Sequence, residues 1–255
     1  MTGFVTCGLD DSLGNQMFQI AVVLKYSKSH NKSPVFFTSN GLSYGNLQTF
    51  KKEEQEKYNF REVKVKNCSD YMEIPQIDEN IILSGNFASF EYLTDHIRDK
   101  IQDIFFSNED MMYYTYDLYK QIKKEMNSEI DDDYVTVHVE KSNLQDKCYY
   151  EKAYDIVSQM IASNGAYGPK KVIVFSDDIE WCRQNFNIDN ATNTYFVQEK
   201  DAHIQMILMT FFTHNILSNS SLSWWGSYLS NNKDKIVIFP SQSNNNVRVP
   251  QWIIV

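Results

Sequence analysis

Three short polar clusters in the second half of the chain have the residue types of a nucleotide-binding site. They are His138-Val139-Glu140-Lys141, Ser176-Asp177-Asp178 and the hydroxyl-rich run 218–223. Hydroxyl groups and the unpaired backbone N–H groups of a helix start can hold a phosphate, and a carboxylate can accept hydrogen bonds from the N1–H and N2–H groups of guanine. The clusters therefore suit a nucleotide, provided that the fold brings them together.

The segments that must position these clusters alternate strictly between strand and helix. Strands are predicted at 134–139, 171–176, 194–198, 215–218 and 235–239, and helices at 149–163, 179–186, 202–213 and 223–230. Such alternation is typical of a parallel sheet with right-handed crossovers, in which ligands bind at the carboxyl ends of the strands. We therefore expect a Rossmann-like half. The chain has no G-x-G-x-x-G and no P-loop, which leaves nicotinamide and flavin sites of the usual sort without support.

The first half predicts a further α/β arrangement with fewer chemical signals. Strands are expected at 4–7, 34–38 and 81–85, and helices from Met17 onward, at 90–106 and at 109–126, with a polar surface excursion at 41–70 that holds one short helix. Gly14-Asn15-Gln16 lies where the first strand hands over to the first helix. The uncompensated acidic run Asp131-Asp132-Asp133 predicts a boundary, so the expected domains are 1–130 and 131–255.

Composition sets limits on the class of protein. Of 255 residues, 42% are hydrophobic, which predicts a folded chain, and the net charge of −9 argues against binding to nucleic acid or to an anionic membrane. The four scattered cysteines form no Cys-x-x-Cys pair and favour a reduced, cytoplasmic setting. We recognise no signal peptide, and no apolar run approaches the ~20 residues of a membrane span.

Three segments carry a resemblance to a known family. Residues 13–19 (LGNQMFQ), 175–181 (FSDDIEW) and 214–226 (HNILSNSSLSWWG) closely resemble the α-1,2-fucosyltransferases, glycosyltransferase family 11, with weaker echoes at 83–87 and at Ile97-Arg98. The resemblance implies a GT-B-like fold of two Rossmann-like halves with parallel sheets, a GDP-fucose donor bound mainly by the C-terminal half, inverting transfer to a glycan hydroxyl and no required metal. It also gives Asn15 a role at the transferred sugar or the phosphate.

The chain departs from the family at one motif. Where that family has His-x-Arg-Arg-x-Asp, with a first arginine that grips the diphosphate, this chain has His138-Val139-Glu140-Lys141-Ser142-Asn143. Losing a charge-assisted contact costs roughly 1.5 to 3 kcal/mol, and a carboxylate ~4 Å from a phosphate adds up to about 4 kcal/mol of repulsion at an effective dielectric of ~20. Lys141 can recover part of this as a point charge, without the planar fork of arginine.

Three explanations of this departure stay open. Glu140 rotates away and Lys141 serves the phosphate, which leaves a transferase with a shifted donor preference. Alternatively, Glu140, Asp10 and Asp11 gather a divalent cation, since hard cations take oxygen ligands. In the third, catalysis is lost and the protein is a nucleotide-binding or glycan-binding module on a preserved fold. Release of a nucleoside diphosphate from a sugar donor distinguishes an enzyme from such a module.

The predicted site is assigned to residues as follows. The base and ribose fall to His138, Asp177 and Asp178, supported by Ser176, and the diphosphate falls to Lys141, Ser220, Ser221 and Ser223. Asn15 serves the transferred group. Inversion needs a base for the acceptor hydroxyl, for which Asp10, Asp11 and Glu140 are the available carboxylates. Catalysis is thus expected from Asn15, His138 and Glu140, whereas Trp224 and Trp225 are expected to be packing residues.

Overall fold

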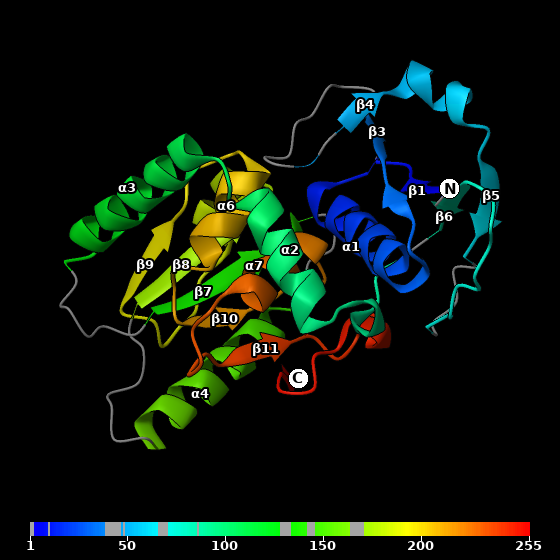
Figure 1. Ribbon diagram of the computed structural model, residues 1–255. Helices are drawn as coiled ribbons and strands as arrows, with labels where there is room; N and C mark the ends of the chain where they lie inside the picture. Colours follow the sequence, from blue (N-terminus) through cyan, green and yellow to red (C-terminus); the bar gives the residue numbers. More distant parts are fainter. Residues whose placement is uncertain are drawn as a thin grey trace. The chain divides into compact units, whose positions relative to one another are not determined.

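The computed structural model describes residues 3–9, 11–38, 47, 49–65, 71–85, 87–127, 134–141, 146–163 and 171–255 (Figure 1). The chain divides into two compact units. The first is Met1–Asn108 with Asn244–Arg248, and the second is Glu109–Ser243 with Val249–Val255. Both units are built on parallel sheets with helices, as expected of the α/β class.

The first unit has a four-stranded parallel sheet of order β2-β1-β6-β5. Its strands are β1 (Phe4–Cys7), β2 (Ser33–Pro34), β5 (Arg61–Lys64) and β6 (Ile81–Ser84), and a separate parallel pair joins β3 (Phe36–Thr38) to β4 (Thr49–Lys51). The helices are α1 (Leu13–His30) and α2 (Asp95–Phe105), with the 3-10 turns η1 (Lys52–Tyr58), η2 (Phe90–Tyr92) and η4 (Asn245–Val247). Helix α1 buries apolar side chains on most of its faces, because it packs on β1 and α2 at once.

The second unit has a six-stranded parallel sheet of order β12-β11-β10-β7-β8-β9. Its strands are β7 (Tyr134–Val139), β8 (Lys171–Ser176), β9 (Asn193–Phe196), β10 (His214–Ile216), β11 (Val237–Phe239) and β12 (Ile253–Ile254). Its helices are α3 (Glu109–Glu125), α4 (Lys147–Ser163), α5 (Ile179–Asn185), α6 (Ala202–Met209) and α7 (Ser221–Leu229). The series from β7 to β11 alternates strand and helix, as the sequence predicts.

Alternation along the strands divides the core of the second unit between two faces of its sheet. Val135, Val137 and Val139 of β7 pack with α4 and α5 on one face. Tyr134 faces the other way and packs with α3 and α6. Each fully buried aliphatic side chain contributes about 1.5 to 3 kcal/mol, so this two-sided core holds the strand ends in fixed positions.

The boundary between the units differs from the expected one at 130/131. Helix α3 belongs to the second unit, because its Ile122 and Met126 share a core with Tyr134 and Phe212. The division therefore lies ahead of α3, at 108/109, and a short segment after residue 243 returns to the first unit. The acidic run 131–133, which suggested the boundary, lies outside the described residues.

Several element bounds also need correction. Helix α1 begins at Leu13 instead of Met17, so the Gly-Asn-Gln residues form its first turn. The strand expected at 34–38 is divided between two sheets as β2 and β3. The helix expected at 90–106 begins only at Asp95, because the Thr94 side chain caps it by accepting from the backbone N–H of Ile97 at 3.4 Å. Strands β4, β5 and β12 were not predicted. Strands β4 and β12 have only three and two residues, and β5 (REVK) lacks an apolar pattern. None of the described helices is long and apolar enough to cross a membrane.

Candidate functional site

The three polar clusters meet at one edge of the second sheet. Strands β10, β7 and β8 are neighbours in that order and run parallel, with Ile216 beside Val137 and Val139 beside Ser176. The residues that follow these strands therefore emerge side by side at the carboxyl edge, where parallel sheets bind their ligands. The central expectation of the sequence, that the clusters converge, is confirmed.

His138 is anchored by Ser218, a member of the hydroxyl-rich run 218–223 to which we assigned no individual role from the sequence. Its Nδ1 lies 2.7 Å from Oγ of Ser218, which is fully buried at the end of β10. Burial lowers the pKa of His138 to about 4, against a smaller opposite effect of the Asp177 charge. The imidazole is therefore neutral near pH 7, with one nitrogen that donates and one that accepts. Position alone, directly after the neighbouring strand, could have singled out Ser218.

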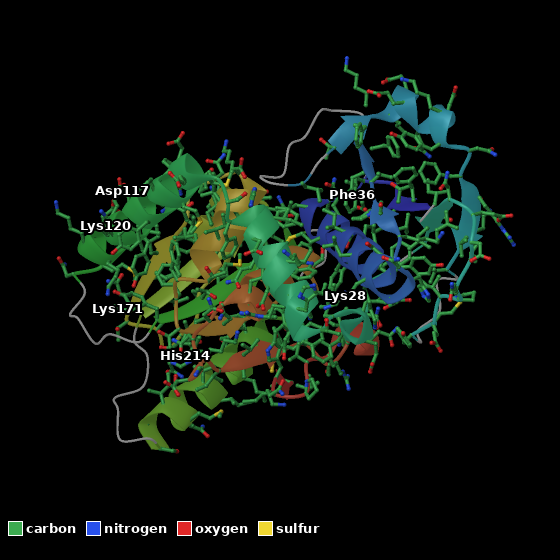
Figure 2. All side chains as sticks on the ribbon, viewed as in Figure 1. Lys28, Phe36, Asp117, Lys120, Lys171 and His214 are labelled. Carbon is green, nitrogen blue, oxygen red and sulfur yellow. The ribbon has the colours of Figure 1, made fainter. Side chains whose placement is uncertain are left out.

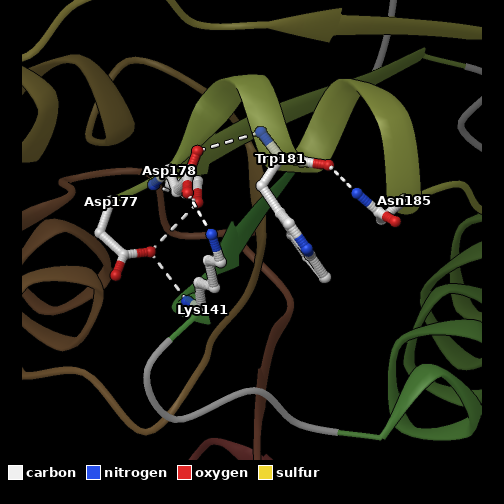
Figure 3. Close-up of polar contacts among 6 residues, drawn as sticks. Lys141, Asp177, Asp178, Trp181 and Asn185 are labelled. Atoms are coloured by element: carbon white, nitrogen blue, oxygen red, sulfur yellow. Dashed lines mark hydrogen bonds and ion pairs between the residues drawn. The ribbon is translucent and has the colours of Figure 1, made fainter.

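Lys141 is tied to both aspartates of the next cluster. Its backbone N–H donates to Oδ1 of Asp177 at 2.8 Å, and its Nζ donates to Oδ2 of Asp178 at 2.5 Å (Figure 3). The Nζ also lies 5.9 Å from the centroid of the Trp181 ring. Lys141, which sequence analysis assigned to the diphosphate, is thus held in an ion pair by the protein's own carboxylate.

The two aspartates have different hydrogen-bonding capacity left. Asp178 caps α5, since its Oδ1 accepts from the backbone N–H of Trp181 at 3.0 Å, and Lys141 and this N–H together lower the pKa of Asp178. Oδ1 of Asp177 accepts from Lys141 and, at 3.3 Å, from Oγ of Ser176. No described residue donates to Oδ2 of Asp177. Of the two, Asp177 is the one that keeps an oxygen for a ligand.

Glu140 stands apart from this network. Its side chain is half-buried, and within the described part of the chain it has no hydrogen bond or ion pair. Burial raises the pKa of Glu140, and the nearby Asp177 charge raises it further. A carboxylate with a raised pKa and no partner is a better proton acceptor than an ordinary glutamate.

The start of α7 supplies the hydroxyl groups. Ser220 is the cap, and its Oγ accepts from the backbone N–H of Leu222 at 3.3 Å. Ser221 is partly exposed beside it. Ser223 is fully buried and donates to the backbone oxygen of Ser220 at 3.2 Å, so its hydroxyl is not presented to a ligand. The candidate phosphate-binding groups of this segment are therefore Ser220, Ser221 and the first backbone N–H groups of the helix.

The two tryptophans of this segment are core residues, as predicted. Trp224 and Trp225 are 1% and 0% exposed. Their rings meet edge to face at 5.0 Å, and Trp224 stacks on Tyr228 at 4.7 Å. They fix α7 against the sheet and do not offer a face to a sugar.

Asn15 lies in the first unit, beside a separate pocket. Its Nδ2 donates to Oδ2 of Asp11 at 3.0 Å, while Oδ1 of Asp11 accepts from the backbone N–H of Ser12 at 2.6 Å. The pocket has a volume of about 300 Å³ and is lined by Asp11, Asn15, Phe18, Gln19, Gly85, Phe87 and Ala88. The Oε1 atom of Gln19 is buried with no hydrogen-bond partner among the described residues. The sequence did not reveal this pocket.

Asp10, a candidate base and cation ligand, lies outside the described residues, as do Ser142 and Asn143 of the compared motif. Among the residues that are described, no three His, Cys, Asp or Glu side chains are grouped to hold a metal ion. The cation set of Glu140, Asp10 and Asp11 stays a hypothesis, because one of its members is not described.

The chain is similar to known glycosyltransferases along nearly its whole length. The glycosyl transferase family 11 model matches residues 2–253. The O-antigen biosynthesis glycosyltransferase WbnK of Escherichia coli is 27% identical over 96% of this chain and 98% of its own. An α-1,2-colitosyltransferase of Escherichia coli is 39% identical over 70 residues, which are 27% of this chain and 24% of that protein.

A solved structure is similar over most of the chain. The fucosyltransferase NodZ from Bradyrhizobium has a TM-score of 0.52 and 12% identity over 90% of this chain and 93% of its own. NodZ has also been crystallised with GDP. At this level of identity the likeness shows the fold alone, which is GT-B-like, as expected.

Proposed function

Because the chain belongs to glycosyl transferase family 11 and is therefore a glycosyltransferase, we propose that it moves a sugar from a GDP-linked donor to a glycan hydroxyl with inversion. The alternative of a catalytically inactive binding module has no support in the comparisons. The observation that carries the proposal is the convergence of His138, Asp177 and the start of α7 on three neighbouring strand ends. GDP is the nucleotide with which the structurally similar NodZ was crystallised.

Asp177 and His138 bind the nucleoside in this proposal. The unused Oδ2 of Asp177 accepts from the N1–H and N2–H groups of guanine, a pairing that uracil cannot offer. The neutral imidazole of His138, fixed by Ser218, hydrogen-bonds a ribose hydroxyl with its other nitrogen. Asp178 does not contact the nucleotide in this proposal, because its two oxygens already accept hydrogen bonds from Trp181 and Lys141.

The diphosphate is held at the start of α7. Ser220, Ser221 and the free backbone N–H groups of the first turn face an anion that the helix dipole favours. Lys141 joins them by exchanging the Asp178 carboxylate for a phosphate oxygen, as a point charge. With these donors the diphosphate needs no resident metal, so we propose metal-independent transfer.

In the proposal, Asn15 serves the transferred sugar and Glu140 serves the acceptor hydroxyl. Asn15 offers its amide to the transferred sugar beside the Asp11 pocket. Glu140 is the preferred base for the acceptor hydroxyl, because its pKa is raised and it has no described partner. Asp11 is less suited, since both of its carboxylate oxygens already accept hydrogen bonds, from the backbone N–H of Ser12 and from Asn15.

The relatives guide the choice of sugar and acceptor. We propose fucose as the transferred sugar, with colitose as the alternative that the short match to the colitosyltransferase favours. We propose a bacterial surface polysaccharide repeat as the acceptor class, because WbnK, which matches this chain along nearly its whole length, is named for O-antigen biosynthesis. A cytoplasmic setting fits the free thiols of Cys7, Cys148 and Cys182.

Calorimetric titration of the purified chain with GDP, UDP and GDP-fucose, each with and without Mg²⁺, tests the proposal. We expect GDP and GDP-fucose to bind without metal. Ser221→Ala should weaken GDP binding about fivefold through one lost hydrogen bond, and Ser163→Ala, at the exposed end of α4, should not. Binding of UDP alone, or only with Mg²⁺, contradicts the donor assignment. If only the Glu140→Arg variant binds GDP, the proposal that the wild-type protein is an active transferase is contradicted.

A further inference from the structure

Two adjacent tyrosines at the start of α4 hydrogen-bond the ends of two strands of the candidate donor site. The hydroxyl of Tyr149 donates to the backbone oxygen of Leu217 at 2.6 Å, directly after β10. The hydroxyl of Tyr150 donates to the backbone oxygen of His138 at 3.2 Å, near the end of β7. The two rings meet edge to face, with centroids 5.1 Å apart. Two consecutive residues of one helix thus hold both strand ends.

The bond from Tyr149 takes the place of a sheet hydrogen bond that the sequence rules out. Beyond the end of β10, the ladder with β11 continues, since the backbone N–H of Leu217 donates to the oxygen of Ile238 at 3.0 Å. In a parallel ladder of this register, the oxygen of Leu217 would accept from the backbone N–H of the residue at position 240. That residue is a proline, Pro240, which has no N–H. Because a buried carbonyl needs a donor, the Tyr149 hydroxyl completes the ladder here.

Tyr150 supplies a donor to β7 in a similar way. The ladder between β7 and β10 ends at the pair Val137 and Ile216, so the backbone oxygen of His138 lies beyond it. Tyr150 donates to this oxygen from a side chain that is 1% exposed. Its ring packs edge to face on Phe186, with centroids 5.1 Å apart. The core therefore fixes the ring, and the ring fixes the hydroxyl against β7.

A side chain also completes the β10–β11 ladder at its other end. His214, the first residue of β10, accepts at its Nδ1 from the backbone N–H of Ile236 at 3.0 Å (Figure 2). This bond lies at the amino edge of the sheet, opposite the edge that carries the candidate donor site. Side-chain bonds thus fix β10 against β11 at both ends, and the one from Tyr149 lies at the edge where the site residues emerge.

The site residues follow these two carbonyls at once. Ser218, which hydrogen-bonds the imidazole of His138, comes directly after Leu217. Ser220, the cap of α7, lies two residues further along. A shift of either strand end therefore moves groups that we assign to the nucleoside and the diphosphate. Binding groups must stay within about 0.5 Å of their working positions, so the bonds that hold the strand ends affect binding directly.

Both hydroxyls stay protonated in any ordinary assay. Burial raises the pKa of Tyr149 and that of Tyr150 well above the usual range of tyrosine. The two side chains therefore act as hydrogen-bond donors and do not exchange protons with a substrate.

We propose that Tyr149 and Tyr150 are positioning residues of the donor site, which hold the carboxyl ends of β10 and β7 in the arrangement that binds a nucleoside diphosphate. The inference rests on the proposed function, because the donor site is assigned there. It differs from a structural role in one measurable respect. Loss of either hydroxyl weakens nucleotide binding by the folded protein, beyond any effect on the folded fraction.

The first experiment removes each hydroxyl and keeps each ring, in Tyr149→Phe and Tyr150→Phe. Tyr92→Phe is the matched control, because the Tyr92 hydroxyl donates to the backbone oxygen of Met72 at 3.0 Å in the first unit. Tm and the calorimetric affinity for GDP are measured for each protein, the affinity well below Tm. We expect all three variants to lose stability. GDP binding should weaken about tenfold in the two α4 variants and stay within about twofold of wild type in Tyr92→Phe. The loss should be the same at about pH 6 and about pH 8, since the hydroxyls do not titrate there.

The second experiment is a rescue. Pro240→Ala returns a backbone N–H at the position from which the oxygen of Leu217 can accept. Tyr149→Phe/Pro240→Ala should therefore bind GDP within about threefold of Pro240→Ala alone. Tyr150→Phe/Pro240→Ala should keep the full loss, because the carbonyl that it leaves unpaired belongs to β7. If Tyr149→Phe alone does not fold, the double variant should restore both folding and GDP binding.

Four results overturn the inference. Lowered Tm with unchanged GDP affinity in Tyr149→Phe and Tyr150→Phe would make both residues structural. An equal loss of GDP affinity in Tyr92→Phe would trace the effect to general instability. Recovery of GDP binding in neither or in both of the Pro240→Ala double variants would contradict the role given to the Leu217 carbonyl. Absence of GDP binding in wild type overturns the proposed function and this inference together, whereas the other three results leave the proposed function intact.

Discussion

Nζ of Lys141 lies 2.5 Å from Oδ2 of Asp178, so the cation that we assign to the diphosphate is already paired within the protein. Glu140 and Lys141 stand where the His-x-Arg-Arg-x-Asp motif used in the sequence comparison has two arginines. The pair is partly exposed, with side chains 46% and 37% accessible. Exposed pairs of this kind are weak, so a diphosphate can readily replace the Asp178 carboxylate at Lys141.

Replacing Asp178 by asparagine should strengthen GDP binding about twofold to fivefold. The asparagine side chain still caps α5 through its oxygen, but it no longer competes with phosphate for Lys141. Calorimetric titration measures the change. Asp177→Asn is the matched control and should weaken GDP binding, because it removes a carboxylate that we assign to guanine. Equal losses in both variants would show that Asp178 contacts the nucleotide directly.

Glu140 should control the acidic limb of the pH–rate profile. The pKa of Glu140 is raised by burial and by Asp177, so the base is protonated, and turnover falls, at a pH above the usual glutamate range. Turnover should rise with pH through that pKa in wild type, and Glu140→Gln should be slow at every pH while GDP affinity stays within about threefold of wild type. Glu140→Arg should bind GDP more tightly yet turn over slowly. Rapid turnover by Glu140→Arg contradicts the role as base.

The same carboxyl makes a second, independent prediction about stability. Because the pKa of Glu140 is raised in the folded state, folding favours its protonated form. The stability that Glu140 contributes to the fold is therefore lost as the pH rises through that pKa. Glu140→Gln should therefore raise Tm at pH 7, and the difference should vanish at a pH low enough to protonate Glu140. Thermal unfolding followed by circular dichroism across this range measures it. A Tm difference that does not depend on pH would mean that the pKa is not raised.

The sequence predicts the convergence of the three clusters because strand order in a doubly wound sheet follows general rules. The bounds of β7 and β8 agree with the expectation, since their apolar runs end abruptly at Glu140 and Asp177. The hydrogen bond between His138 and Ser218 joins residues 80 positions apart, so no local pattern contains it. The ion pair of Lys141 with Asp178 likewise depends on the register of β7 against β8, which no local sequence pattern contains.

The position of the unit boundary was missed for a related reason. From the sequence, helix α3 is expected to belong to the same unit as α2, since both helices are amphipathic and only a few residues separate them. Which sheet an amphipathic helix covers depends on contacts such as that of Ile122 with Phe212, far along the chain. The exposed tyrosines of α3, Tyr113, Tyr114 and Tyr116, add to this, because hydrophobic periodicity alone does not separate a buried aromatic from an exposed one.

His138 should make the fold sensitive to acid. Burial lowers the pKa of His138 from the usual 6.5 to about 4, so folding favours the neutral imidazole. The free energy of unfolding therefore decreases as the pH falls from 6.5 to about 4. The full loss amounts to about 3 kcal/mol, taking ~1.4 kcal/mol per pKa unit. Urea unfolding at pH 7 and pH 4 measures it, and His138→Asn should reduce the difference between the two pH values. Ser218→Ala keeps the imidazole and should retain the pH dependence.

Gly226 should be intolerant of even one added methyl group. A Cβ built at Gly226 would lie 2.9 Å from Cβ of Met209 and 3.3 Å from the backbone oxygen of Met206, where α7 crosses α6. Overpacking of this kind costs about 1 to 3 kcal/mol, which exceeds the ~1 kcal/mol that alanine gains over glycine within a helix. Gly226→Ala should therefore lower the free energy of unfolding and loosen the helix that carries Ser220 and Ser221.

Ser227→Ala is the matched control on the same helix. The Ser227 hydroxyl is buried with no hydrogen-bond partner among the described residues, so its removal should be neutral or stabilising. Destabilisation by both changes to the same extent would mean that α7 tolerates no substitution, whatever the contact with Met209.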